Sequence, residues 1–301
     1  NCVLLLLYLR KERGKMKGGK AGVLNRFFSE RTFRNLINEI DDKTYEAVIQ
    51  KYVREDFMDF TNHYAIQQIY ALLRKAYRNE YFYKNTILNK LLLHVHSIRT
   101  TTALRELSIG KSKADFVLIN GKAVVYEIKT ELDNFERLGD QVASYYKAFD
   151  HVVVVTSIEN EREILNFKEI PDTVGIYLLQ KNGYFKRRRE PVKNVAYIDS
   201  EVLFKLLRKQ EYLSIILDYY GRVPDVNQFA FYQTCKKWFT DMPLCISYPK
   251  TLSILKKRVS IDENAFKQVP YELKFLVYFM EFTSKDYLSL HNFLNGSYGR
   301  Q

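Results

Sequence analysis

The stretch 104–149 constrains the fold more than any other part of the chain. Two apolar runs, FVLI at 116–119 and AVVY at 123–126, flank an Asn-Gly pair, which is the pattern of a buried β-hairpin. Asp115 directly precedes the first run, and the triplet EIK at 127–129 ends the second. Because a buried charge is costly unless it is paired or bound to a metal, these charges indicate a functional site.

The turn between the two strands decides whether the two carboxylates can act together. A two-residue type I′ turn pairs Ile119 with Lys122 and places Asp115 and Glu127 on opposite faces. A three-residue turn with its glycine in the left-handed conformation pairs Leu118 with Lys122 instead. The carboxylates then lie diagonally on one face. A functional site at this hairpin therefore predicts the three-residue turn.

Further polar side chains follow the same stretch. Alternation along 104–109 places Glu106 on a polar face, either as a third carboxylate of the site or as an ordinary solvent-facing residue. The stretch 135–149 has helical spacing, with Asp133 or Asn134 as the expected N-cap. On this helix Arg137, Gln141 and Tyr145, four residues apart, form one polar ridge beside the apolar one. An ordinary amphipathic helix is the alternative interpretation of that ridge.

Asp115 followed after eleven residues by the triplet at 127–129 resembles the PD-(D/E)XK phosphodiesterase superfamily. Glu106 resembles the upstream acid of that superfamily. The spacing Gln141-x-x-x-Tyr145 resembles the QxxxY motif of its RecB-like branch. The four elements occur in the right order and on the expected secondary structures.

The resemblance covers about residues 100–180 and implies an α/β fold, a restriction-endonuclease-like mixed sheet. Ala114 stands where the motif has proline, and no clear histidine precedes Glu106 in a matched context. The chain has no cysteine quartet, so an iron–sulfur cluster, which some members of that branch carry, is not expected.

The resemblance implies metal-dependent hydrolysis of phosphodiester bonds, with Mg²⁺ or Mn²⁺ as cofactor. Asp115, Glu127 and the carbonyl of Ile128 are the implied metal ligands, and Glu106 completes the ligand shell directly or through water. Lys129 is expected to orient the attacking water or to stabilise the developing charge.

The helix and a loop supply the remaining candidates. Gln141 and Tyr145 are expected either to position the nucleic-acid backbone or to support the metal shell. Lys111, Lys113 and Arg137 are candidate contacts to phosphates. Two rival interpretations stay open: a catalytically inactive or regulatory nucleic-acid-binding module on the same fold, and a helical interaction protein with an incidental α/β insert.

The flanks of the stretch predict three modules. We expect an N-terminal helical module at 1–99, a nuclease-like α/β core at 100–198, and a C-terminal helical module at 199–301. Within the first module, Asn62 and Asn85 are expected N-caps. Further strands of the core are expected at 152–155, 174–179 and 184–188.

Charge and cysteine content suggest partner and compartment. Lys and Arg number 47 against 35 Asp and Glu, a net charge of +12, which favours nucleic acid as partner, and we expect DNA more than RNA. The three cysteines have no paired spacing, which indicates a reducing compartment, here the cytoplasm. The apolar run 2–9 is too short to span a bilayer, so no membrane partner is expected.

Four segments allow two interpretations each. The aromatic cluster at 81–83 either stacks bases or belongs to a core. The basic run KRRR at 186–189 either contacts phosphates or protects an edge strand. The Gly-rich basic segment 10–22 touches phosphates or is a solvated loop. His94 and His96 would share a face only on a strand, and the helical spacing around them argues against a metal site.

Overall fold

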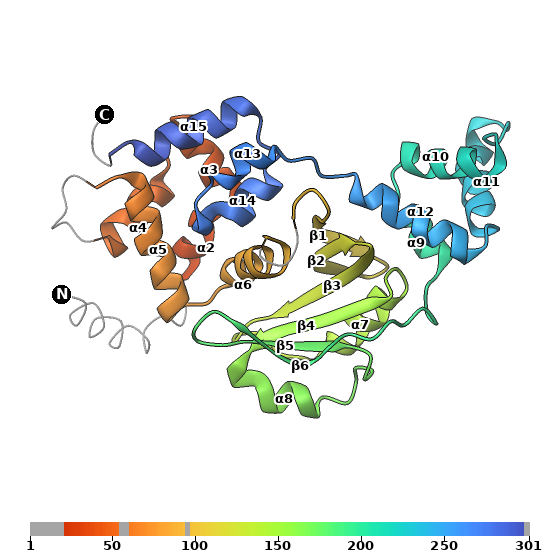
Figure 1. Ribbon diagram of the computed structural model, residues 1–301, viewed down its shortest axis with the longest axis horizontal. Helices are drawn as coiled ribbons and strands as arrows, with labels where there is room; N and C mark the ends of the chain where they lie inside the picture. The colour runs from red at the N-terminus through yellow and green to blue at the C-terminus, as the bar shows by residue number, and fades with distance from the viewer. Residues whose placement is uncertain (1–20, 54–59, 94–96, 298–301) are drawn as a thin grey trace. The chain divides into compact units, whose positions relative to one another are not determined.

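The computed structural model of the protein describes residues 21–53, 60–93 and 97–297 (Figure 1). The chain divides into two compact units: Val95–Ser260 forms one, and Asn1–His94 with Ile261–Gln301 forms the other. The predicted C-terminal module 199–301 is therefore divided at residue 260 between the two units. The predictions for 2–9, for 10–20 and for the pair His94 and His96 lie outside the described residues.

The first unit consists of helices. Its described elements are α2 (Ala21–Phe27), α3 (Glu30–Ile37), α4 (Lys43–Tyr52), α5 (Asn62–Ala76), α6 (Glu80–Ile87), the π-helical η1 (Leu88–Leu93), α13 (Glu263–Lys267), η3 (Tyr271–Leu273), α14 (Lys274–Phe279) and α15 (Ser284–Asn295). The predicted N-caps are wrong by a few residues. Thr61, not Asn62, caps α5, and Asn79 caps α6. Asn85 lies within α6, where its side-chain amide donates to the hydroxyl of Tyr70.

The aromatic cluster of the first unit belongs to a core. Tyr81, Phe82 and Tyr83 are all buried, and the ring of Tyr81 stacks on Phe28 with 4.5 Å between the centroids. The core interpretation is confirmed, because buried rings cannot stack on bases.

The second unit is built around a six-stranded mixed sheet, shown in yellow to green in Figure 1. Its strands follow the chain order: β1 (Thr102–Ile109), β2 (Ser112–Asn120), β3 (Lys122–Lys129), β4 (His151–Ser157), β5 (Gly175–Leu179) and β6 (Phe185–Arg189). The first three strands are antiparallel, β3, β4 and β5 run parallel, and β6 is antiparallel to β5. The prediction of a mixed α/β core is confirmed.

The hairpin β2–β3 has neither the two-residue turn nor the three-residue turn that the sequence analysis considered. Its register pairs Asn120 with Lys122 and Ile119 with Ala123, so a single residue, Gly121, separates the strands. Gly121 is left-handed, with φ of 69°, as the bulged turn required. Both predicted pairings of Lys122, with Ile119 and with Leu118, are wrong, because the ladder closes closer to the turn.

Helices cover the sheet. The crossover from β3 to β4 contains α7 (Leu138–Tyr146), which packs on β2 and β4, and the next crossover contains η2 (Ile158–Asn160) and α8 (Glu161–Asn166). After β6 come α9 (Ser200–Leu206), α10 (Lys209–Tyr220), α11 (Gln228–Thr240) and α12 (Leu244–Lys256). Of these, α9 packs on β1 and α12 on β2, and their apolar side chains join the core under α7.

The basic run at 186–189 lies on β6, at the edge of the sheet. Its side chains form ion pairs with nearby acids. Lys186 and Arg188 pair with Glu161, and Arg187 pairs with Glu190. This favours the edge-strand interpretation, since charges on an edge strand oppose pairing with another chain. Among the described residues no helix is long and apolar enough to cross a bilayer.

Candidate active site

The candidate site lies at the end of β3, where β2 and α7 meet it. The last pair of the hairpin before the site is Phe116 with Tyr126. Continuing the same register by one residue places Asp115 directly across from Glu127. Directly opposed residues of an antiparallel pair project from the same face. Asp115 Oδ2 also accepts a 2.8 Å hydrogen bond from the backbone N–H of Ile128. The two carboxylates therefore share a face.

Glu127 is the centre of the site, and its carboxylate is almost completely buried, with 2% of the residue exposed. Its Oε1 accepts a 2.6 Å hydrogen bond from Gln141 Nε2 and lies 3.2 Å from Lys129 Nζ. Its Oε2 accepts a 2.5 Å hydrogen bond from the hydroxyl of Tyr145. Three predicted site residues thus converge on a fourth.

Lys129 contributes a second buried charge, with 7% of the residue exposed. It lies two residues after Glu127 on β3, so both side chains project from one face. Its Nζ donates a 2.7 Å hydrogen bond to Oε1 of Gln141. Gln141 therefore accepts from Lys129 and donates to Glu127, and its amide orientation is fixed by both partners.

Helix α7 presents Gln141 and Tyr145 one turn apart on the side that meets the sheet. The helix begins at Leu138, and its N-cap, Arg137, makes no side-chain capping bond. The predicted cap Asp133 has another role, because its Oδ2 accepts from both the backbone N–H and the hydroxyl of Thr130, at 2.8 and 2.7 Å. These bonds hold the loop between β3 and α7.

The electrostatics of the site follow from burial. Burial raises the pKa of the Glu127 carboxyl, and the hydrogen bond from Tyr145, the charge of Lys129 and the amide of Gln141 oppose that shift only in part. Burial, together with the negative charges of Glu127 and Asp115, raises the pKa of the Tyr145 phenol. Tyr145 therefore keeps its proton and acts as a hydrogen-bond donor.

Glu106 does not join the cluster. The β1–β2 register places it across from Asp115, but the ladder is interrupted there and Glu106 has a left-handed φ of 49°. Its exposed carboxylate forms a 3.0 Å ion pair with Lys113 Nζ. The exposed side chain of Glu106 agrees with the alternative interpretation of this position, an ordinary solvent-facing residue.

The remaining predicted residues lie around the site. Lys111 is exposed in the turn between β1 and β2, and Arg137 is exposed one turn before Gln141. Lys113 has a role that the sequence did not suggest, because its backbone carbonyl lies 3.0 Å from the hydroxyl oxygen of Tyr145 and shares the single phenolic proton with Glu127. The structure records a contact for the N–H of Ile128, and a ligand role for its carbonyl stays a prediction.

One contact that ties α7 to the sheet was missed. The hydroxyl of Ser112 donates a 3.0 Å hydrogen bond to that of Ser144, whose own hydroxyl donates to the carbonyl of Asp140. The available signal was the position of Ser144, three residues after Gln141 and so beside it on the helix.

The donor set can be compared with the needs of a divalent cation. Among the described residues, no group of three or more His, Cys, Asp or Glu side chains gathers closely enough to hold a metal ion. Mg²⁺ is usually bound by one or two carboxylates and completes its shell with water and substrate phosphates. Asp115 and Glu127 supply two carboxylates, and Oε2 of Glu127, with one hydrogen bond, keeps a lone pair. Two carboxylates match the number that Mg²⁺ usually takes from a protein.

These features define a class: a mixed α/β protein whose sheet carries a buried carboxylate and lysine, both held by an amide and a phenol from one crossover helix. The chain belongs to the family described as bacteriophage P4 protein cII, whose model matches residues 74–268. That range contains the whole sheet and α7. No curated protein and no solved structure matches the chain.

Proposed function

We propose that this protein is a metal-dependent nuclease with a restriction-endonuclease-like core, which hydrolyses phosphodiester bonds of nucleic acid, DNA more than RNA. One observation carries the proposal: Lys129, Gln141 and Tyr145 all contact the buried carboxylate of Glu127. The order of strands and the crossover helix agree with it, and so does the net charge of +12.

Stability alone does not account for the cluster. A buried ion pair is often no more stabilising than well-packed apolar residues of similar size, because both charges lose their hydration. The neighbouring positions of the same strand, Val125 and Ala123, are apolar and buried. A fold that needed only packing could continue that pattern through 127 and 129. The cost of the charges is explained if they act on a ligand.

The residues have distinct tasks in this proposal. Asp115 and Glu127 hold Mg²⁺ or Mn²⁺ on the shared face of the hairpin. When bound, the cation lowers the pKa of a water molecule and neutralises charge on the scissile phosphate. Lys129, a compact cation beside Glu127, orients the attacking water or stabilises the charge that develops on the phosphate oxygens.

The helix residues act through Glu127. Gln141 and Tyr145 donate to its two oxygens and so fix the direction in which the carboxylate faces. Of the two roles expected for them, these contacts support the role in the ligand shell. Lys111, Lys113 and Arg137 are proposed to contact phosphates on either side of the scissile bond.

An inactive nucleic-acid-binding module on the same fold is a second candidate. The side chain of Glu106, which pairs with Lys113, favours it, since Asp115 and Glu127 are then the two carboxylates that face the site among the residues the structure describes. A cytoplasmic location is proposed for both candidate functions, and the free thiols of Cys235 and Cys245 agree with it.

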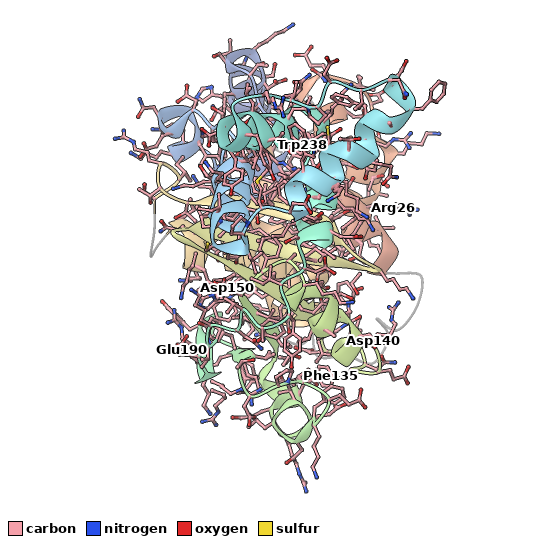
Figure 2. The ribbon with its side chains drawn as sticks, turned by 90° about the vertical axis from the view of Figure 1, so that its right-hand side faces the viewer. Arg26, Phe135, Asp140, Asp150, Glu190 and Trp238 are labelled. Carbon is pink, nitrogen blue, oxygen red and sulfur yellow. The ribbon has the colours of Figure 1, made fainter. Side chains whose placement is uncertain are left out.

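A panel of linear, circular and single-stranded DNA and of RNA, incubated with Mg²⁺, Mn²⁺ or EDTA, tests the proposal. We expect cleavage with either cation, none with EDTA, and a loss of about 100-fold or more in Asp115→Asn, which keeps an acceptor for Ile128. The matched control is Asp140→Asn, an exposed carboxylate on α7 (Figure 2). Binding without cleavage would favour the second candidate, and unchanged activity in Asp115→Asn would refute the site.

A further inference from the structure

The end of α10 and the first turns of α11 expose four aromatic side chains. Phe229 is 98% exposed, and Tyr219, Tyr220 and Tyr232 are between 37% and 46% exposed. Together with Arg222 these four residues are called here the α10–α11 surface. Large aromatic side chains are normally buried, so a group of them in solvent indicates a binding surface.

The local structure explains why Phe229 is exposed, whereas Tyr232 also contacts Phe204 and Tyr220 also contacts Trp238. Gly221, left-handed with φ of 72°, ends α10 and lets the chain turn. Asn227 then caps α11, with its side chain accepting from the N–H of Ala230. Phe229 follows as the second residue of that helix and points to solvent. The helices themselves pack through other residues, Tyr212 and Phe239 among them, so the fold does not require a ring at 229.

The charge around the surface is positive. Residues 199–260 contain ten Lys and Arg against six Asp and Glu, a net charge of +4. Lys209 Nζ lies 5.5 Å from the ring centroid of Phe231, and Arg222 Cζ lies 5.6 Å from that of Trp238 (Figure 2 labels Trp238 on α11). Neither cation forms an ion pair with a described residue. Four other cations of this region are paired with acids: Lys236, Lys237, Lys250 and Arg258.

We propose that the α10–α11 surface, together with Lys209 of α10, binds single-stranded nucleic acid, with bases stacked on Phe229 and on the other exposed rings of α10 and α11 and with phosphates at Arg222 and Lys209. The inference rests on the proposed nuclease function in one respect: it names single strands as the substrate class. Exposed rings beside unpaired cations are what single strands need, because every base offers a face for stacking and every nucleotide carries a negative charge. Bases within a duplex are already stacked and cannot use the rings.

Charge complementarity favours this occupant over a protein. An apolar protein partner, or a second copy of the chain, would have to bury Arg222 and Lys209 without any carboxylate already in place to compensate them. A single strand supplies phosphates to both and releases counterions when it binds.

Fluorescence anisotropy of a labelled oligothymidylate with the full chain in EDTA tests the proposal. Phe229→Leu keeps an apolar side chain without a ring, and it is expected to weaken binding about 5- to 150-fold, while Phe229→Tyr keeps the wild-type affinity. Arg222→Gln is expected to reduce the slope of log affinity against log salt by about 0.7. The matched control is Tyr197→Ala, which removes an exposed ring outside the surface and leaves binding unchanged.

Several results would overturn the proposal. The first is that Phe229→Leu binds the oligothymidylate with wild-type affinity. The second is that Phe229→Leu weakens binding of a duplex of the same length as much as binding of the single strand. The third is that the wild type sediments as a dimer that Phe229→Leu dissociates. The two proposals fail separately. If Phe229→Leu weakens single-strand binding but the protein cleaves no substrate, the proposed nuclease function is refuted and the proposed binding surface is supported. If Asp115→Asn abolishes cleavage but Phe229→Leu leaves binding unaffected, the proposed nuclease function is supported and the proposed binding surface is refuted.

Discussion

The hydroxyl of Tyr145 donates a 2.5 Å hydrogen bond to Oε2 of Glu127, across eighteen residues of sequence. The bond joins α7 to β3, and a second contact of the same hydroxyl, 3.0 Å to the carbonyl of Lys113, adds β2. One phenol thus holds together the three elements that form the candidate site. A charge-assisted hydrogen bond of this kind is about twice as strong as a neutral one.

Tyr145→Phe is expected to destabilise the protein by about 1–3 kcal/mol, because it leaves a buried carboxylate with one donor fewer. Urea denaturation measures the loss. The matched control is Tyr146→Phe on the same helix, which removes a neutral 2.8 Å hydrogen bond to Thr173 and should cost about 0.5–1.5 kcal/mol. Equal losses in the two variants would show that the bond to Glu127 has no special strength.

Lys129→Met is expected to cost about 3–5 kcal/mol of unfolding free energy, since it leaves the buried Glu127 without its cation. Combining it with Glu127→Gln should cost clearly less than the sum of the single losses, because the two charges are removed together. A double-mutant cycle by chemical denaturation measures the coupling. Lys113→Met is the control, since its exposed ion pair with Glu106 should contribute less than about 1 kcal/mol. Strict additivity at 127 and 129 would contradict the buried pair.

The raised pKa of Glu127 predicts a pH dependence of stability. The folded protein binds this proton more tightly than the unfolded chain, whose value is 4.5, so the stabilising contribution is complete below pH 4.5. It is lost as the pH rises through the folded pKa. Stability measured in EDTA should therefore fall over that range, and Glu127→Gln should remove this part of the slope. An unchanged slope in the variant would assign it to another group.

The same titration predicts the opposite trend in activity. The proposed reaction needs Glu127 as a carboxylate, so cleavage should rise with pH where the protein loses the proton. A rate profile that falls over that range would contradict the assignment of Glu127 as a ligand.

Gly121→Ala is expected to destabilise the second unit by about 1–2 kcal/mol, because Gly121 has a φ of 69° that alanine adopts only with strain. An added Cβ meets nothing within 4 Å, so the backbone alone causes the cost. Gly121→Asn should cost less, since asparagine tolerates the left-handed conformation. Thermal unfolding compares the two variants, and equal costs would point to a change in the turn instead.

The predictions that succeeded depend on short-range geometry. The buried hairpin, the buried strand β4 and the helix that carries Gln141 and Tyr145 all follow from side-chain period, which the backbone itself determines. Those that failed depend on partners distant in sequence. Asp133 was expected to cap α7, but its carboxylate accepts a hydrogen bond from Thr130, and α7 begins at Leu138, five residues after Asp133.

The site shows the same division. Shared parity put Glu127 and Lys129 on one face from the sequence alone, but the face of Asp115 depended on a turn that was neither of the two alternatives. Carboxylates that face together were expected, and the structure has them opposed directly instead of diagonally. Glu106 was expected either in the site or in solvent, and its backbone is left-handed and its exposed carboxylate pairs with Lys113.

The local pattern of residues was enough to predict the order of strands and helices, the charges at 115, 127 and 129 at the end of the hairpin, and the spacing that places Gln141 and Tyr145 on one side of a helix. These follow from local backbone periods and need no distant partner. The strand register, the ion pair of Glu106, the division of the C-terminal helices at residue 260 and the exposure of Phe229 became known from the folded chain alone. Each of these depends on which distant surfaces pack together, and burial of apolar area selects that packing across the whole chain.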